Sequence, residues 1–212
     1  MQSSMVQDEV HFLLVDRTVQ YAIVNPHEDK DLAQLLPSEL KEMASIMHEK
    51  RRKEYAAIRK LKNRIFKNHR ILYTLNGKPY LETSEKHIGI SHSKNFALFA
   101  YSDSSFGCDI EEIDDRLLRV KNRFTNHREL SMLAHFSPLD QLCMLWTSKE
   151  AIYKLLGFSG VNWNVDCQLI EVIFPRLIFK LIWREKEIQL MCYLQQPCEN
   201  AWISWAIIKE NE

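Results

Sequence analysis

Several signals that set a protein apart from ordinary globular chains are missing from this sequence of 212 residues. It contains only 5 glycines and 6 prolines and no low-complexity tract, so we expect a compact chain without a long linker. Its apolar runs fall short of the roughly 18 residues that a membrane-spanning helix needs. The start, Met1–Glu9, is polar and acidic, whereas a signal peptide opens with a basic and then an apolar region. We therefore predict a cytoplasmic protein that does not bind membranes.

A cysteine framework and a net charge are also missing. The five cysteines are scattered, odd in number and never in a Cys-x-x-Cys pair, which supports neither a disulfide scaffold nor a zinc site. The chain has 28 basic residues, lysine or arginine, and 28 acidic residues, aspartate or glutamate, so its formal net charge is zero. The positive field of a nucleic-acid-binding protein is absent, and we predict no nucleic-acid partner. An anionic ligand would have to be held by local basic clusters.

The first half of the chain has the pattern of an α+β lobe, supported by a hydrophobic content of 46% that can fill a core. A helical stretch from about Pro37 to Phe66 carries an apolar stripe on one face. Short apolar, often β-branched runs before and after it predict strands. These runs are Val10–Val15, Val19–Val24, Ile88–Ser91, Phe96–Tyr101 and Phe106–Ile110. The run Phe96–Tyr101 is apolar on both faces, which predicts a central strand.

The second half repeats this mixture of helices and strands. Its predicted helices are Arg116–Phe124, a short piece near Arg128–Phe136, and Pro138–Leu156. Pro138 suits a helix start and Gly157 a helix end. Its predicted strands lie near Arg176–Arg184, Glu187–Leu194 and Ala201–Lys209. We therefore predict a two-lobed α+β architecture, with residues 1–112 and 113–212 as the lobes.

A pair of carboxylates ends a predicted strand in the segment Gly107–Glu111. Asp109 and Glu111 lie two residues apart, so they point to the same face of the strand, and Glu112 points to the other. Two hard oxygen ligands with room for water and phosphate suit Mg²⁺. The alternative is that these acidic residues merely close a strand.

The last predicted helix of the second half contains a further cluster of charged residues. Trp146, Glu150 and Lys154 share one helix face at positions i, i+4 and i+8. Glu150 could supply a third carboxylate or a general base, and Lys154 a cation for a phosphate. Lys149 sits beside them, about 100° around the helix axis. The alternative is an ordinary surface pair of glutamate and lysine next to a core tryptophan.

Two segments of the first half could bind phosphate. Ser91 and His92 leave a short strand, where a hydroxyl and an imidazole can contact phosphate oxygens. A Ser–His hydrolase is disfavoured because adjacent strand residues point apart and no Gly-x-Ser-x-Gly elbow is present. In the basic segment Glu49–Lys60, Arg52 and Arg59 lie two turns apart on one face and could grip one phosphomonoester. The alternative is a solvated basic face.

Taken in this order, the segments resemble the surfactin-synthetase-activating type of 4′-phosphopantetheinyl transferase, whose members are pseudo-dimers of two α+β lobes in one chain. The resemblance covers about Glu49 to Gly157. Five segments carry it: Arg51–Arg59 resembles the family's arginine-rich helix, Gly77–Tyr80 its Gly-Lys-Pro loop, Ile90–Ser93 its Ser-His-Ser strand, Gly107–Glu111 its Gly-x-Asp-x-Glu motif, and Trp146–Lys154 its Trp-x-x-Lys-Glu-Ala-x-x-Lys helix. Ile58 stands where many members have glycine. The resemblance implies lobes with small, mainly antiparallel sheets packed with helices.

The resemblance also implies roles for individual residues. The Mg²⁺ ligands would be Asp109, Glu111 and Glu150. The phosphates of coenzyme A would be held by His92 with Ser91, Lys149 and Lys154, the 3′-phosphate by Arg52 and Arg59, and the adenine by Lys78 and Pro79. Lys154 and Glu150, or a water that Glu150 positions, would act in catalysis.

The implied reaction is attack of a carrier-protein serine on the β-phosphorus of coenzyme A, with release of 3′,5′-ADP. The implied partners are coenzyme A and an apo acyl or peptidyl carrier protein, and we expect a monomer. Two alternatives stay open. One is a coenzyme A or nucleotide-binding module that has lost transfer, although the three carboxylates and both helix lysines are intact. The other is an interaction protein whose basic helix docks an acidic partner.

Overall fold

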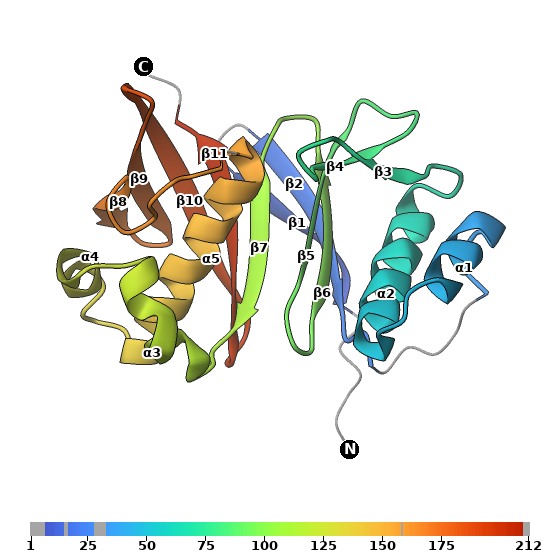
Figure 1. Cartoon of the computed structure of the whole chain (residues 1–212), viewed down its shortest axis with the longest axis horizontal. Helices are drawn as coiled ribbons and strands as arrows, with labels where there is room; N and C mark the ends of the chain where they lie inside the picture. The colour runs from blue at the N-terminus through green and yellow to red at the C-terminus, as the bar shows by residue number, and fades with distance from the viewer. Residues whose placement is uncertain (1–6, 15–16, 28–32, 158, 210–212) are drawn as a thin grey trace. The chain divides into compact units, whose positions relative to one another are not determined.

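The chain forms two compact units, Met1–Ser104 and Ser105–Glu212, in a computed structural model (Figure 1). The structure describes residues 7–14, 17–27, 33–157 and 159–209. Each unit contains one antiparallel sheet packed with helices, which confirms the predicted two-lobed α+β class. In the described part of the chain, no helix is both long and apolar enough to cross a membrane.

Unit 1 is built on a six-stranded sheet with the order β1-β2-β6-β5-β4-β3. The strands are β1 (Gln7–Leu14), β2 (Arg17–Val24), β3 (Ile71–Tyr73), β4 (Pro79–Leu81), β5 (His87–His92) and β6 (Ala97–Ser102). Every residue of β6 is buried and the strand lies between β2 and β5, which confirms its predicted central place. The short strands β3 and β4 were not predicted, since three residues are too few to show an alternating pattern. Val15, at the end of one predicted strand, lies outside the described residues.

The helical stretch predicted for unit 1 is two helices, α1 (Pro37–Ala44) and α2 (Glu49–Ile65). Ala57, Ile58 and Leu61 of α2 join Ile88 and Phe99 of the sheet in one apolar cluster. This packing uses the apolar stripe that the sequence predicted on α2. The helix therefore holds its N-terminal basic residues at one side of the sheet.

Unit 2 has a five-stranded sheet with the order β7-β11-β10-β9-β8. The strands are β7 (Gly107–Glu112), β8 (Cys167–Ile173), β9 (Arg176–Trp183), β10 (Lys186–Cys198) and β11 (Ala201–Ile208). The helical segments are α3 (Arg116–Val120), the 3₁₀ turn η1 (Lys121–Arg123), α4 (His127–Met132) and α5 (Pro138–Leu156). Strands β7, β9, β10 and β11 match predicted strands, whereas β8 was not predicted.

The division between the units differs from the predicted boundary after residue 112. Strand β7 pairs with β11, from Gly107 opposite Ala206 to Glu112 opposite Ala201, and so belongs to unit 2. The units separate between Ser104 and Ser105. A strand pattern in the sequence does not identify its sheet, because the partner strand can lie far along the chain, here about ninety residues away.

Helix α5 starts and ends where the sequence predicted. The Ser137 hydroxyl accepts a hydrogen bond from the Asp140 amide, Pro138 occupies the first turn, and Gly157 ends the helix in the left-handed conformation with φ 66°. Its buried face includes Leu142, Leu145 and Ile152 and belongs to the main core of unit 2.

Gly107 lets α5 lie directly against strand β7. A Cβ atom added at Gly107 would lie 2.0 Å from the carbonyl oxygen of Ala151 and 2.7 Å from the amide nitrogen of Leu155. Both are backbone atoms, which cannot swing aside as a side chain can. The absence of a side chain at this position therefore sets how closely α5 and the acidic strand approach.

We predict that Gly107→Ala destabilises the protein by about 1–3 kcal/mol or more, because the strand and helix must separate to admit the methyl group. Urea unfolding followed by tryptophan fluorescence measures the loss. Gly77→Ala is the control: nothing lies within 4 Å of its added Cβ, and only its φ of 78° opposes the change. That control should cost about 1 kcal/mol. A Gly107→Ala protein of wild-type stability would contradict the close approach.

Candidate active site

The residues that the sequence singled out in unit 2 meet where β7 faces α5. Lys154 Nζ lies 2.7 Å from Asp109 Oδ1, forming a partly buried ion pair between the helix and the strand. Asp109 is buried on β7, and Lys154 is about one-third exposed. The pair joins two motifs that lie 45 residues apart in the sequence.

The third carboxylate, Glu150, is electrostatically coupled to the other two. Burial raises the pKa of Glu150, the charge of Asp109 raises it further, Lys154 opposes this effect, and Glu111 adds to it. Three carboxylates therefore act on one another within a small region. Repulsion of this kind is relieved by a bound cation or a proton.

Lys154 keeps its positive charge in this site. Burial by itself would lower the pKa of Lys154, but the neighbouring Asp109 carboxylate, with help from Glu150, outweighs burial and raises it. A charged ammonium that remains partly exposed beside a carboxylate group can bind a substrate phosphate.

Glu111 has its own basic partner, which the sequence analysis missed. The guanidinium of Arg116, at the start of α3, donates a hydrogen bond to Glu111 Oε1. Glu111 and Glu112 are both buried on β7. Arg116 follows Glu111 by five residues across the turn into α3, and no regular helix or strand spacing would have indicated that contact.

The acidic group fits Mg²⁺ by its donor chemistry rather than by a ready coordination shell. Hard carboxylate oxygens are the ligands that Mg²⁺ takes. After the larger effect of burial, the charges of Asp109 and Glu111 also raise the pKa of Glu150, and a bound cation would oppose this repulsion. Within the described ranges, however, no three histidine, cysteine, aspartate or glutamate side chains are arranged to hold a metal ion. Asp109 and Glu111 instead contact Lys154 and Arg116. The assignment of the three carboxylates to Mg²⁺ stays a prediction.

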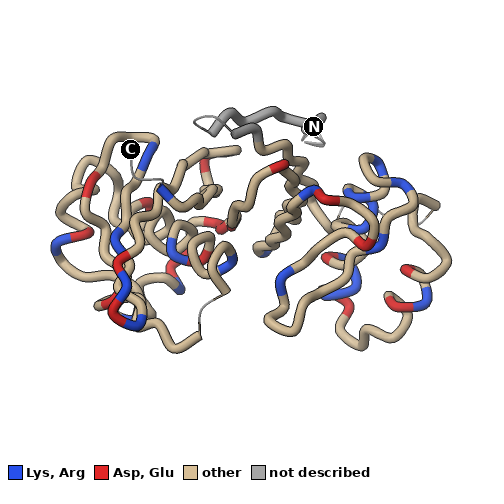
Figure 2. The backbone as a smooth tube through the Cα atoms, turned by 90° about the horizontal axis from the view of Figure 1, so that it is seen from above, with Lys and Arg blue, Asp and Glu red and all other residues tan. Residues whose placement is uncertain are grey.

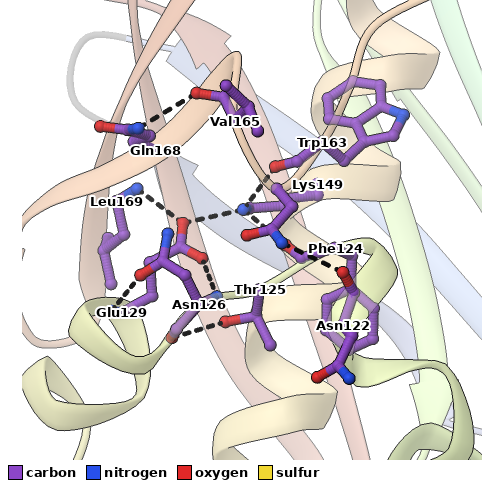
Figure 3. A network of polar contacts seen from close by, with 11 residues as sticks. Asn122, Phe124, Thr125, Asn126, Glu129, Lys149, Trp163, Val165, Gln168 and Leu169 are labelled. Atoms are coloured by element: carbon purple, nitrogen blue, oxygen red, sulfur yellow. Dashed lines mark hydrogen bonds and ion pairs between the residues drawn. The ribbon is translucent and has the colours of Figure 1, made fainter.

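The structure places Lys149 differently from the prediction that it binds a coenzyme A phosphate. The side chain is 3% exposed, and its Nζ atom donates to the carbonyl oxygens of Phe124 and Trp163 and to Glu129 Oε1, at 2.6 to 2.8 Å (Figure 3). An ammonium group has three N–H donors, and three protein acceptors take them. The physical reason is the 100° step per residue, which turns Lys149 into the core while Glu150 stays half-buried.

The two arginines predicted to grip one phosphomonoester lie in different environments of unit 1. Arg52 is exposed near the start of α2. Arg59 is 4% exposed, lies 3.9 Å from Glu39 of α1, and stacks 4.4 Å from the ring centre of Tyr55. Helix α1 packs beside this part of α2, so Arg59 serves the contact between the two helices. Arg52 alone keeps the exposure that a phosphate ligand needs.

The Ser-His-Ser segment places its histidine toward solvent. Ser91 is buried on β5, whereas the His92 side chain is about half exposed and its Nδ1 lies 3.7 Å from Glu54 Oε2. Glu54 is a buried residue of α2 that the sequence analysis did not consider, and it also lies 3.6 Å from Lys50. The spacing of four residues between Lys50 and Glu54 on the helix could have indicated their ion pair from the sequence.

The Gly-Lys-Pro segment forms a tight turn before β4. The Gly77 amide donates to the Thr74 carbonyl, and Gly77 adopts a φ of 78° that favours glycine. Burial lowers the pKa of Lys78. The pKa of His87 is lowered mainly by its own burial and further by the charge of Lys78. Pro79 is the first residue of β4.

Basic and acidic residues are interspersed along the backbone in both units (Figure 2). This distribution agrees with equal totals of 28 basic and 28 acidic residues. Binding of a charged ligand would therefore depend on individual placed charges, such as those of Lys154 and Asp109.

Comparison with known proteins gives a family-model match that lies within unit 2. The family model described as the 4′-phosphopantetheinyl transferase superfamily matches residues 105–205. A 4′-phosphopantetheinyl transferase named gsp from Aneurinibacillus migulanus is 33% identical over 95 residues, which is 42% of this chain and 40% of that protein. The corresponding proteins psf-1 from Bacillus pumilus and 4′-phosphopantetheinyl transferase from Bacillus subtilis are 32% and 31% identical, over 43% and 42% of this chain and 40% and 42% of their own lengths. The matched part thus spans about two fifths of these relatives.

The different placements of the two arginines give a prediction about stability. Arg59→Met should lower the free energy of unfolding by about 1–3 kcal/mol, because a buried charged contact to Glu39 is lost. Arg52→Met, the same substitution at an exposed position of the same helix, should stay within about 0.5 kcal/mol of wild type. Urea denaturation of both variants measures this. Equal effects would show that Arg59 does not join the helices.

Proposed function

We propose, on the premise that residues 105–205 belong to the 4′-phosphopantetheinyl transferase superfamily, that this protein is an Mg²⁺-dependent 4′-phosphopantetheinyl transferase. It moves the phosphopantetheine group of coenzyme A onto a serine of an apo acyl or peptidyl carrier protein. The observation that carries the proposal is the ion pair of Lys154 and Asp109, coupled to Glu150, inside the matched region. It combines a charged phosphate ligand with carboxylates suited to a metal.

The side chains of unit 2 divide the work of phosphoryl transfer. Asp109, Glu111 and Glu150 would hold Mg²⁺, which when bound neutralises charge on the pyrophosphate of coenzyme A. Lys154, which is charged and partly exposed, binds a pyrophosphate oxygen and stabilises the negative charge of the transition state. For Lys154 this requires a change of partner from Asp109 to phosphate.

The chemical step forms one bond and breaks one. The carrier serine oxygen bonds to the β-phosphorus, and the bond from that phosphorus to the bridging oxygen breaks, so that 3′,5′-ADP leaves. The serine proton passes to Glu150 or to a water that Glu150 positions.

In unit 1, the residues with exposed polar atoms keep the roles that the resemblance implies. The half-exposed imidazole of His92 contacts a phosphate of coenzyme A, and the exposed guanidinium of Arg52 contacts the 3′-phosphate. Lys78 and Pro79, at the entry to β4, present backbone groups to the adenine. Arg59 and Ser91 are buried, and their proposed role is to support these segments.

The metal assignment predicts the response of transfer to single substitutions. Asp109→Asn and Glu150→Gln should each lower kcat/KM on the order of a hundredfold or more, about 3 kcal/mol of transition-state stabilisation, while each variant keeps its fold. Glu112→Gln, on the same strand, is the matched control and should have a mild effect. The assay is the intact mass of several apo carrier proteins incubated with coenzyme A, with Mg²⁺ or with EDTA.

The same assay separates the proposal from its alternatives. Wild-type protein that binds coenzyme A but adds no mass to any carrier would be a binding module without transferase activity. Transfer that persists in EDTA, or an Asp109→Asn protein as active as wild type, would overturn the metal assignment.

A second prediction concerns Lys154 as a phosphate ligand. Lys154→Met should weaken coenzyme A binding roughly ten- to a hundredfold, the effect expected for one charge-assisted contact to phosphate. The stabilisation of the protein by coenzyme A in a thermal-shift experiment should shrink accordingly. Lys180→Met is the control. Lys180 belongs to the same unit, and its Nζ lies 3.9 Å from Glu187 Oε2 in a pair that is partly exposed to solvent. Unchanged affinity in Lys154→Met would show that this lysine serves the Asp109 pair alone.

A further inference from the structure

A buried ion pair between α4 and α5 lies beside the proposed site. Lys149 and Glu129 are 3% and 1% exposed, and Lys149 Nζ lies 2.8 Å from Glu129 Oε1 (Figure 3). The same Nζ atom donates to the carbonyl oxygens of Phe124 at 2.6 Å and Trp163 at 2.8 Å. The ammonium group is thus satisfied by the protein itself.

The Glu129 carboxylate is equally well satisfied. Besides Lys149, it accepts hydrogen bonds from the backbone amides of Leu169 in β8, at 2.9 Å, and Asn126, at 3.1 Å. The Asn126 side chain accepts in return from the Glu129 amide, which completes a capping box at the start of α4. One carboxylate therefore ties the first turn of α4 to the edge strand β8 and to α5.

Two of the residues bonded to Lys149 also pack their rings against α5. The ring of Phe124 contacts Trp146, one turn before Lys149, with centroids 5.0 Å apart. The ring of Trp163 contacts Tyr153, one turn after Lys149, at 6.1 Å. Backbone and ring of each residue thus hold α5 on both sides of Lys149. These contacts resist rotation of the helix about its axis.

Rotation of α5 about its axis would move the proposed site residues away from β7. Glu150 follows Lys149 directly, about 100° around the axis, and Lys154 lies about one turn beyond Glu150. At the observed rotation and spacing of the helix, Lys154 Nζ lies 2.7 Å from Asp109 Oδ1. A charged anchor in the core can fix that rotation, because moving it would leave a buried charge without its partners.

We propose that Lys149 and Glu129 are positioning residues: their buried pair fixes the rotation of α5 and thereby aims Glu150 and Lys154 at the carboxylates of β7. Lys149 itself does not contact coenzyme A. This inference rests on the proposed transferase function and gives Lys149 a role different from that of Lys154. It also gives a function to Glu129, which lies on another helix.

The test compares Lys149→Met, Glu129→Gln and the double variant with wild type. At a temperature well below unfolding, both single variants should lower kcat at least tenfold. Because both misplace Lys154, a proposed phosphate ligand, any loss of coenzyme A affinity should agree within about twofold between the two variants. Both should also lower the melting temperature. The double variant should be more stable than Lys149→Met, because it leaves no buried carboxylate unpaired.

A control separates positioning from stability alone. Leu177→Ala removes a buried side chain of β9, a strand on the far side of β10 from β11, and should lower the melting temperature with kcat unchanged. If Lys149→Met or Glu129→Gln behaved in the same way, the pair would be structural only and the inference would be overturned. Should Lys149→Met fail to fold, Glu129→Gln and the double variant carry the comparison.

Two further outcomes are decisive. A Lys149→Met protein that binds coenzyme A at least tenfold more weakly, beside a normal Glu129→Gln protein, would make Lys149 a phosphate ligand and overturn the inference. Wild-type protein that loads none of the carriers overturns the proposed function together with this inference. An active wild type with unaffected variants overturns the positioning role alone.

Discussion

The close contact between the backbone of α5 and strand β7 at Gly107 is the constraint on which the rest of unit 2 depends. With 2.0 Å between a hypothetical Cβ and the Ala151 carbonyl oxygen, only glycine permits this approach. Because the two elements lie so close, the Lys154 side chain reaches Asp109. For the same reason, the charges of Asp109 and Glu111 raise the pKa of Glu150, after the larger effect of burial. The grouping of these charged side chains is therefore a consequence of the close packing of α5 on β7.

Charged residues in this protein do two different kinds of work, and burial separates them. Lys149 and Arg59 are nearly inaccessible and each lies close to an acidic residue of a neighbouring helix, Glu129 and Glu39. Lys154 and His92 retain exposed surface beside a carboxylate. A buried charge needs its protein partners, whereas an exposed one can exchange a partner for a ligand. In a chain of zero net charge, this local division takes the place of a global field.

The sequence of this protein specifies its regular elements more clearly than their pairing. Helix α5, with Ser137, Pro138 and Gly157 at its ends, carries its boundaries in local residue chemistry, and the central strand β6 carries its position in its apolar pattern. The strands β3, β4 and β8 carry no comparable pattern and depend on neighbours for pairing. The boundary between the units depends on the pairing of β7 with β11, two segments far apart in the chain.

By itself, the sequence determined the two-lobed α+β class, the resemblance to a transferase superfamily, and the charged residues of β7 and α5 on which the proposed function depends. The tertiary structure alone decided which of the adjacent residues Lys149 and Glu150 faces the core, and which of Arg52 and Arg59 stays exposed. The spacing of residues along a helix determines which side chains share a face. It does not state which neighbouring element covers that face, because that depends on contacts between residues distant in the chain.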